Sequence, residues 1–413
     1  MKKELFAKNR KKLWDKLEKD SITLIFAGDA PYKSGDEKYA FTPNRNFYYL
    51  TGIDRAKMIF MLVKRDGKIE ETLFIEKNDP VMARWIGEKM SEDEAKESSG
   101  IDRVMFLEEF EETFGLILDR SKIDSLYLDL ERQEFHSCPS TSQRFAKVAM
   151  ERYPYLSIKN IYHEIASFRL IKSKEEIELI REAINITDKG IKELMKNSKA
   201  GMKEYELEAY FDFTLRSSGV TEYAFHTIAA SGKNATVLHY NENKSKLEDG
   251  SLVLFDLGAQ YKYYNADISR TFPVNGKFTE RQKQVYNIVL KAQEAVTAMA
   301  RPGILFSTLN ETAKKILIEG CKEIGLIKED SEISKYYFHG VSHYLGLDTH
   351  DVGRRDLELK PGMVLTNEPG LYIEEESMGI RIEDDLLITE DGCENLSKQI
   401  IKTVEEIEGF MAK

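Results

Sequence analysis

Cysteine is scarce in this 413-residue chain, and the three that occur, Cys138, Cys321 and Cys393, lie far apart. An odd number of cysteines without a C-x-x-C pair excludes a disulfide framework and a zinc ribbon, and it is typical of a reducing compartment. The N-terminal segment carries positive charge but lacks the apolar region of a signal peptide. We therefore expect a cytoplasmic protein.

Long apolar runs and an excess of positive charge are also missing. No run approaches the roughly 18 apolar residues that a membrane-spanning helix requires. The net charge of -11 argues against nucleic acid or an anionic membrane as a partner, because both attract basic surfaces. What is present, 42% hydrophobic and 32% charged residues, indicates a globular protein, and the length predicts two domains.

The first 160 residues alternate strand and helix patterns, which predicts an α/β domain with a mixed sheet over 1–160. The segment KMIFMLVKRDGKIEETLFIEK predicts two strands joined by a tight turn at Asp66 and Gly67. The segment SEDEAKESSG predicts a helix that ends at Gly100. Histidines, cysteines and acids do not cluster here, so no catalytic site is expected in this domain.

The remaining residues, 161–413, predict an α+β domain in which helices lie against a largely antiparallel sheet. Ser173 and Glu176 form a capping-box pattern before isoleucines that recur near a 3.6-residue period. Further helices are expected at about 203–216, 280–300 and 306–324. The pattern becomes rich in strands from Thr227 onward.

Carboxylates interrupt the apolar strands of this second domain. In GSLVLFDLGAQYKYYNADISRTF, Asp256 lies within an apolar run, and Asp267 follows in the returning strand. Such a run is typical of a strand buried on both faces, where an unpaired ionised carboxylate is strongly unfavourable. The alternatives are a strand-end acid before Gly258 and a surface acid at Asp267.

Two more acids follow apolar strands. MVLTNEPGLYI contains Glu368, and Pro369 and Gly370 suit the central positions of a type II turn. In GIRIEDDLLIT, strand alternation places Arg381 and Glu383 on the same face. A plain turn glutamate and a salt-bridged sheet surface are the alternatives for these two acids.

Histidines are concentrated in HGVSHYLGLDTHDVG, which contains His339, His343 and His350 out of seven in the chain. The spacing of the first two is that of the zinc motif H-E-x-x-H, but Gly340 stands where that motif has its glutamate. The other ligands of any metal must therefore come from elsewhere in the chain.

Combined with the acids, one histidine gives a set of four carboxylates and one imidazole. One divalent ion rarely uses four carboxylates, whereas two ions about 3.5–4 Å apart do, with some acids bridging them. Oxygen-rich coordination suits Mn²⁺ better than zinc, although Co²⁺ or Zn²⁺ are alternatives. We predict two divalent ions per chain, held by Asp256, Asp267, His343, Glu368 and Glu383.

The motifs DLGAQYKYYNADISRTFPVNGKF, HGVSHYLGLDTHDVG, TNEPGLYI and GIRIEDD together resemble the metallopeptidases of the pita-bread fold, and within them bacterial aminopeptidase P, the Xaa-Pro aminopeptidases. The resemblance covers 161–413 closely. The preceding domain is similar more loosely, through FTPNRNFYYLTGI and RWIGEKM, to the creatinase-type N-terminal domain. The family resemblance implies a curved pita-bread sheet flanked by helices in the second domain. It also implies an N-terminal domain that serves oligomerisation and active-site gating, and a homodimer or homotetramer.

The resemblance also implies roles for the five predicted ligands. Asp267 and Glu383 would bridge the ions, Asp256 would complete one site, and His343 and Glu368 would complete the other. A hydroxide that bridges the ions would be the nucleophile, with Glu368 accepting the proton. The implied reaction is hydrolysis of the bond between an N-terminal residue and a penultimate proline in small peptides.

Five more residues take implied roles around the substrate. His239, in SGKNATVLHYNEN, and His350 would hydrogen-bond the substrate carbonyl or the tetrahedral intermediate. His339 would line the proline side of the cleft, and Arg381 would orient the bridging acid or meet the carboxyl side of the substrate. Trp85, in RWIGEKM, would reach the active site of a neighbouring subunit. The alternatives are structural histidines, an ion-paired arginine and a packed tryptophan.

Three other functions are compatible with this fold. A prolidase would use the same centre but require the free carboxylate of an Xaa-Pro dipeptide. A creatinase-like enzyme would hydrolyse a C–N bond without metal, and a non-catalytic pita-bread module would only bind partners. Retention of all five ligands favours a metallopeptidase over the last two.

Overall fold

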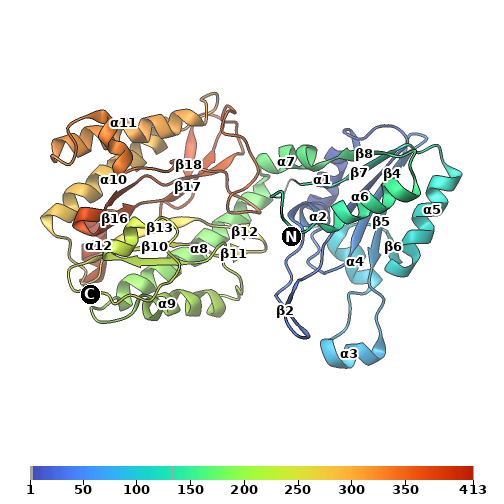
Figure 1. Cartoon of the computed structure of the whole chain (residues 1–413), viewed down its shortest axis with the longest axis horizontal. Helices are drawn as coiled ribbons and strands as arrows, with labels where there is room; N and C mark the ends of the chain where they lie inside the picture. The colour runs from blue at the N-terminus through green and yellow to red at the C-terminus, as the bar shows by residue number, and fades with distance from the viewer. Residues whose placement is uncertain (1–2, 132–133, 413) are drawn as a thin grey trace. The chain divides into compact units, whose positions relative to one another are not determined.

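The computed structural model describes residues 3–131 and 134–412 and divides the chain into two compact units, Met1–Arg169 and Leu170–Lys413 (Figure 1). The division falls at the end of helix α7 (Tyr162–Leu170), whereas the predicted boundary preceded this helix. Within the described ranges, no helix has the length and apolar character needed to cross a membrane.

The first unit is built on the predicted mixed sheet, whose strand order is β6-β5-β4-β1-β7-β8. Strand β1, near the middle of this order, pairs antiparallel with β4 and parallel with β7. The strands are β1 (Ser21–Phe26), β4 (Ile59–Arg65), β5 (Lys68–Ile75), β6 (Arg103–Phe106), β7 (Ser125–Leu128) and β8 (Ser157–Asn160), and a separate small hairpin is formed by β2 (Tyr32–Ser34) and β3 (Glu37–Lys38). The sequence prediction of an α/β domain is confirmed.

The local signals of this unit are also realised. Asp66 and Gly67 join β4 to β5 with φ values of 49° and 69°, the left-handed turn that suits an Asp-Gly hairpin. Gly100 ends α4 in the left-handed conformation, as predicted. The helices are α1 (Lys3–Trp14), α2 (Arg45–Thr51), α3 (Pro80–Ile86), α4 (Glu92–Ser99), α5 (Phe110–Arg120) and α6 (Thr141–Arg152).

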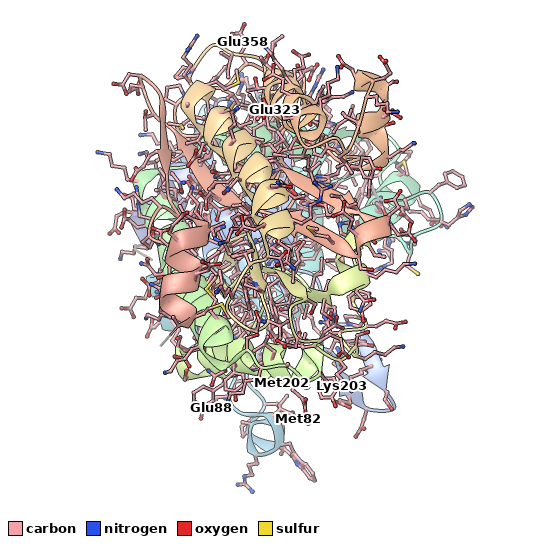
Figure 2. All side chains as sticks on the ribbon, turned by 90° about the vertical axis from the view of Figure 1, so that its left-hand side faces the viewer. Met82, Glu88, Met202, Lys203, Glu323 and Glu358 are labelled. Atoms are coloured by element: carbon pink, nitrogen blue, oxygen red, sulfur yellow. The ribbon has the colours of Figure 1, made fainter. Side chains whose placement is uncertain are left out.

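Helix α3 differs from the other helices of its unit because none of its residues is buried. Trp85 is 82% exposed, Val81 66% and Ile86 62%. Figure 1 shows this helix extending from the rest of its own unit, and Met82 on it is labelled in Figure 2. Apolar side chains of this size are rarely left uncovered together on an isolated surface.

The second unit consists of short antiparallel sheets, and each strand pair described in it runs antiparallel. One sheet has the order β13-β10-β9 and another the order β14-β17-β18, while β11 pairs with β12 and β15 with β16. The strands are β9 (Ile228–Ser231), β10 (Leu252–Leu257), β11 (Gln260–Tyr261), β12 (Tyr264–Asn265), β13 (Ile268–Pro273), β14 (Val364–Asn367), β15 (Gly370–Ile373), β16 (Met378–Arg381), β17 (Asp384–Ile388) and β18 (Cys393–Asn395).

Helices lie on both sides of these strands, with α8 and α9 on one side and α10 and α11 on the other (Figure 1). The predicted capping box is present, because Ser173 and Glu176 each bond the backbone of the other at the start of α8. The helices are α8 (Lys174–Asn197), α9 (Glu204–Ser217), α10 (Glu280–Met299), α11 (Ser307–Glu323) and α12 (Val404–Met411). The predicted α+β architecture is confirmed.

The type II turn predicted after Glu368 is wrong. Such a turn needs a positive φ at Gly370, but this glycine lies in ordinary extended backbone as the first residue of β15. It pairs with Arg381, and a Cβ there would lie 2.6 Å from the Tyr372 hydroxyl and 2.9 Å from the Ile380 carbonyl oxygen. Glycine is thus needed for close approach to β16 and not for a turn.

Candidate metal centre

The β10–β13 pair places the first two predicted acids side by side. Asp256 lies opposite Ser269 in the antiparallel register, and Asp267 stands immediately before β13. The chain reverses between them through the β11–β12 hairpin, where Lys262 and Tyr263 adopt φ values of 48° and 69°. The hairpin therefore brings two carboxylates that are distant in sequence to one end of the sheet.

The loop that carries His343 is fixed to β14, the strand that leads into Glu368. The His343 amide donates to the Thr366 hydroxyl at 3.1 Å, and the Thr366 amide donates to the His343 carbonyl at 2.9 Å. The Glu368 amide donates to the Val341 carbonyl at 2.9 Å. These backbone links hold the imidazole beside the acid at the end of the strand.

Within the described residues, one group of three metal-ligating side chains converges on a point: Asp267, His343 and Glu383 have ligand atoms within 4.8 Å of one another. His343 Nε2 lies 3.3 Å from Asp267 Oδ2 and 3.5 Å from Glu368 Oε1. The His343 Nδ1 atom lies 3.1 Å from the Tyr344 carbonyl oxygen, so it carries the proton. The Nε2 lone pair is therefore directed to the carboxylates, as metal ligation requires.

Asp256 joins this group through a serine and an arginine. The Ser269 hydroxyl lies 3.0 Å from Asp256 Oδ1 and 2.8 Å from Glu383 Oε2. The buried Arg381 side chain donates to Asp256 Oδ2 at 2.5 Å, to Ser269 Oγ at 2.7 Å and to the Tyr372 hydroxyl at 3.0 Å. All five predicted ligands thus lie in one connected cluster, with the Arg381 guanidinium bound to one of its carboxylates.

The electrostatics of the cluster are those of a cation site. Burial, followed by repulsion from Asp256 and Glu368, raises the pKa of Asp267 well above its usual range. Burial, followed by repulsion from Asp267, also raises the pKa of Glu383 well above its usual range. Burial raises the pKa of Glu368 as well. Four carboxylates around one imidazole and one guanidinium leave excess negative charge, which divalent ions would neutralise. The donor set therefore fits a divalent-metal site.

His339 belongs to a hydrogen-bonded chain beside this cluster. Its Nδ1 donates to the Gly340 carbonyl at 2.8 Å, so Nε2 accepts from the Tyr372 hydroxyl at 2.8 Å, which in turn accepts from Arg381. Burial, and then the charge of Arg381, lowers the pKa of His339 to about 4. This histidine is accordingly neutral at physiological pH, and its Nδ1 lies 3.9 Å from Glu368 Oε2.

Of the two other predicted histidines, His350 lies beside a predicted ligand and His239 lies in an exposed turn. The rings of His343 and His350 have centroids 4.3 Å apart, and burial, followed by the charges of His343 and His239, lowers the pKa of His350. His239 is exposed in a turn that follows the 3-10 helix η2 (Gly232–Thr236). Trp85 lies in the first unit, on α3.

Sequence reasoning missed four polar residues of the cluster. Ser269, Thr366 and Tyr372 bond the predicted site residues, as described above. Asp385 is completely buried, and its Oδ2 accepts from the Asp267 amide at 3.2 Å. The available signal was position, because Ser269 is two residues from Asp267 and Asp385 is two residues from Glu383, and side chains two apart in an extended chain point to the same side.

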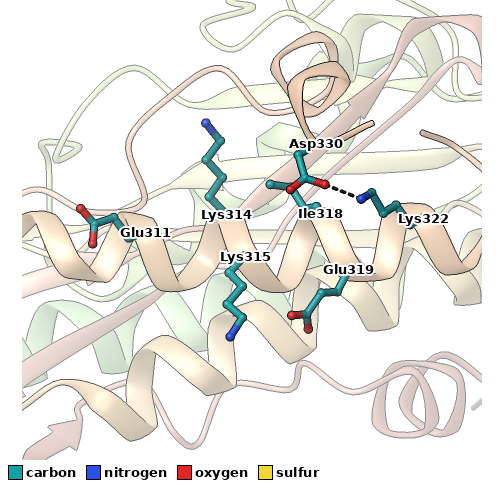
Figure 3. A pocket seen from close by; sticks show the side chains of 7 residues that line it. All are labelled: Glu311, Lys314, Lys315, Ile318, Glu319, Lys322 and Asp330. Atoms are coloured by element: carbon teal, nitrogen blue, oxygen red, sulfur yellow. Dashed lines mark ion pairs between the residues drawn. The ribbon is translucent and has the colours of Figure 1, made fainter. Parts of the chain in front are cut away.

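A separate cavity of about 510 Å³ lies on α11 (Figure 3). It is lined by charged side chains of both signs, and Lys322 forms an ion pair with Asp330 across it. It contains none of the predicted site residues and offers no converging ligand set.

Comparisons with known proteins agree with the two-unit fold and with a metallopeptidase. Residues 178–390 match metallopeptidase family M24, and residues 6–127 match the aminopeptidase P N-terminal domain. The chain is 35% identical to the Xaa-Pro aminopeptidase of Escherichia coli, over 98% of this chain and 97% of that protein. A Bacillus anthracis protein described as an aminopeptidase P is 58% identical over 100% of this chain and 99% of that one, with a TM-score of 0.98.

The structure of E. coli aminopeptidase P with the inhibitor Pro-Leu superimposes with a TM-score of 0.92 at 33% identity, covering 100% of this chain and 98% of that one. A zinc-substituted form of the same enzyme in complex with product gives a TM-score of 0.93 with the same identity and coverage. Identity of this level over whole chains extends to both units. The chain belongs to metallopeptidase family M24, with an aminopeptidase P N-terminal domain.

Proposed function

We propose that this protein is a dinuclear-metal-dependent Xaa-Pro aminopeptidase. The observation that carries the proposal is the imidazole lone pair of His343 directed at Asp267 and Glu368 inside a buried, carboxylate-rich cluster. Relatives of similar length at 32–35% identity are Xaa-Pro aminopeptidases from bacteria. A non-catalytic module would have no need for buried carboxylates at this density.

Two divalent ions would be held by the five clustered side chains. As the family resemblance implies, Asp267 and Glu383 would be shared between the ions, Asp256 would complete one site, and His343 and Glu368 would complete the other. When bound, the ions would lower the pKa of a water molecule and polarise the substrate carbonyl. Oxygen-rich ligation makes Mn²⁺ the proposed metal.

The residues around the ions supply proton transfer and orientation. Glu368 is partly buried, and its raised pKa suits an acid–base group that accepts a proton from water and delivers it to the leaving proline nitrogen. His239 and His350 would donate hydrogen bonds to the carbonyl oxygen as negative charge develops there. His339 would line the proline side of the cleft, and Arg381, linked to it through Tyr372, would orient the bridging acid or meet the carboxyl side of the substrate.

A substrate-length series tests this reaction against the alternative of a prolidase. The protein, loaded with Mn²⁺, is offered Xaa-Pro dipeptides and Xaa-Pro-Yaa tripeptides with the same first residue. We expect release of the first residue from tripeptides and longer peptides, with little turnover where proline is replaced by alanine. Activity restricted to dipeptides would identify a prolidase instead.

Metal content separates the enzyme from a metal-free hydrolase. Elemental analysis after mild purification is expected to give about two ions per chain. Chelator treatment should abolish activity and Mn²⁺ should restore it, with Co²⁺ and Zn²⁺ compared in parallel. Full activity in the presence of a chelator would favour creatinase-like chemistry without metal.

Assembly and location complete the proposal. We propose a homodimer or homotetramer in which Trp85 of one subunit reaches the active site of another, because α3 exposes this ring and other apolar side chains. The unpaired state of Cys138, Cys321 and Cys393 supports a cytoplasmic location. Sedimentation of the protein and of Trp85→Ala, with tripeptide KM for both, tests the assembly. A monomeric protein with full activity would refute it.

A further inference from the structure

Glu204, the first residue of α9, is completely buried although it is far in sequence from the acids of the metal cluster. The catalytic scheme gives it no role. A buried carboxylate is stable only when charges or hydrogen bonds compensate its lost hydration. Its partners therefore show what the chain uses it for.

One carboxylate oxygen binds the chain as it leaves β9. Glu204 Oε1 accepts from the Ser231 amide at 2.7 Å, from the Ser231 hydroxyl at 2.7 Å and from Asn234 Nδ2 at 3.0 Å. These residues are the end of β9 and the middle of η2. The oxygen thus fixes the segment that leads into the turn carrying His239.

The other oxygen binds the chain as it returns from that turn. Glu204 Oε2 accepts from the Tyr240 hydroxyl at 2.9 Å and from the Ser245 amide at 2.9 Å. Tyr240 is the residue directly after His239. The two limbs are also joined to each other, since Asn234 Nδ2 donates to Ser245 Oγ at 2.8 Å.

We propose that Glu204 is a positioning residue for His239, because its two oxygens clamp both limbs of the turn that carries this exposed imidazole. The catalytic role of His239 in this inference rests on the proposed function. The clamp itself rests only on the hydrogen bonds of Glu204. An exposed histidine on an untethered turn would sample many positions, and misplacement by about 1 Å can lower a rate about 100-fold.

The substitution Glu204→Gln preserves size but replaces one acceptor oxygen by a donor. Since both oxygens accept hydrogen bonds, either amide orientation sets a donor against the donors of one limb. Tyr240→Phe is a milder second variant, which removes one hydroxyl at the residue next to His239 and leaves the buried carboxylate in place. Glu176→Gln is the matched control, because Glu176 is equally buried but binds Ser173 and Tyr264 instead.

A double-mutant cycle with His239→Ala tests the proposal in the metal-loaded protein on an Xaa-Pro-Yaa tripeptide. Glu204→Gln should lower kcat about 10- to 100-fold in the native background and change it little in the His239→Ala background, with a smaller effect of the same pattern for Tyr240→Phe. A smaller folded fraction would instead lower kcat by the same factor in both backgrounds. Glu176→Gln should show that additive pattern, and additivity for Glu204→Gln would overturn the proposal.

Amide hydrogen exchange separates failure of the clamp from failure of the proposed function. Glu204→Gln should accelerate exchange of the peptide spanning 231–245 about tenfold or more, with the metal-cluster strands unchanged. Unchanged exchange in 231–245 would overturn the proposal whether or not the protein cleaves prolyl peptides. Accelerated exchange in a protein that cleaves none would establish the clamp and reject the proposed function.

Discussion

Glu383 and Asp384 are neighbours in the sequence, yet their carboxylates lie in opposite electrostatic environments. Asp384 binds Arg270 at 2.7 Å and Lys402 at 2.6 Å. Burial acts to raise the pKa of Asp384, but these two cations outweigh burial and lower this pKa. Burial and the adjacent Asp267 raise the pKa of Glu383 instead. One acid is therefore compensated within the chain, while the other is left for an external cation.

This contrast predicts opposite responses to neutralisation in the metal-free protein. Glu383→Gln removes one repelling charge, so the free energy of unfolding in chelator should stay constant or rise, while metal binding and activity are lost. Asp384→Asn leaves Arg270 and Lys402 without their buried partner and should lower the free energy of unfolding by about 3–5 kcal/mol. Urea unfolding in chelator, with elemental analysis, measures both. Equal destabilisation by the two variants would contradict the assignment.

The same raised pKa values predict an unusual pH dependence. An acid whose folded-state pKa lies above its unfolded value destabilises the fold when ionised, so the metal-free protein should gain stability as pH falls through the raised pKa values of Asp267 and Glu383. Protons compete with metal over that same range, so metal affinity should fall. Thermal unfolding with and without Mn²⁺ across pH tests this. Parallel pH curves for the two forms would refute it.

At the scale of elements, the metal cluster depends on how closely β10 approaches the returning chain. A Cβ at Gly258 would lie 1.8 Å from the Ala266 carbonyl oxygen, and Ala266 directly precedes Asp267. Backbone on both sides cannot yield as a flexible side chain can. Glycine at this position therefore keeps Asp256 and Asp267 within reach of one another.

Gly258→Ala should accordingly lower stability by about 1–3 kcal/mol and weaken metal affinity about 10- to 100-fold. Gly409→Ala is the control, because this exposed glycine of α12 has open space around its Cβ position and should gain about 0.5–1 kcal/mol. Chemical unfolding and metal titration of both variants provide the measurements. Native metal affinity in Gly258→Ala would show that the close approach is dispensable.

Local chemistry explains which elements the sequence could predict. The Asp66-Gly67 turn and the capping box at Ser173 depend on neighbouring residues only, and both formed as predicted. Gly370 was misassigned because glycine is needed there for close approach to β16. A local turn pattern contains no information about that neighbouring strand.

The candidate site divides in the same way. The ligand acids were visible because each interrupts or ends an apolar strand, and the structure places them in one cluster. Ser269 and Tyr372 carry no such signal, since a serine and a tyrosine are ordinary strand residues. Their roles arise only when β13, β15 and β16 meet, and Arg381 bonds both. Glu204 was unrecognised for the same reason.

At the scale of the whole molecule, the two units have separate hydrophobic cores. In the first unit, β-strand residues such as Ile22 and Leu126 pack with Phe110 and Phe114 of α5. In the second, Leu309 of α11 packs among residues of other elements of the same unit. The metal ligands come from the second unit alone. Metal should therefore stabilise one unit directly and not the other.

Both tryptophans of the chain, Trp14 and Trp85, lie in the first unit, so their fluorescence reports its unfolding. In a Trp85→Phe background only Trp14 remains, whose Nε1 donates to Glu71 at 3.1 Å. Mn²⁺ at about 100 times its Kd should stabilise the second unit by about 2.7 kcal/mol per site and raise its calorimetric transition. The Trp14 fluorescence midpoint should stay where it is in chelator. With Glu383→Gln added to Trp85→Phe, Mn²⁺ should move neither the calorimetric transition nor the Trp14 fluorescence midpoint. If Mn²⁺ shifted both in the Trp85→Phe protein without that substitution, the two units would unfold as one and the prediction would be wrong.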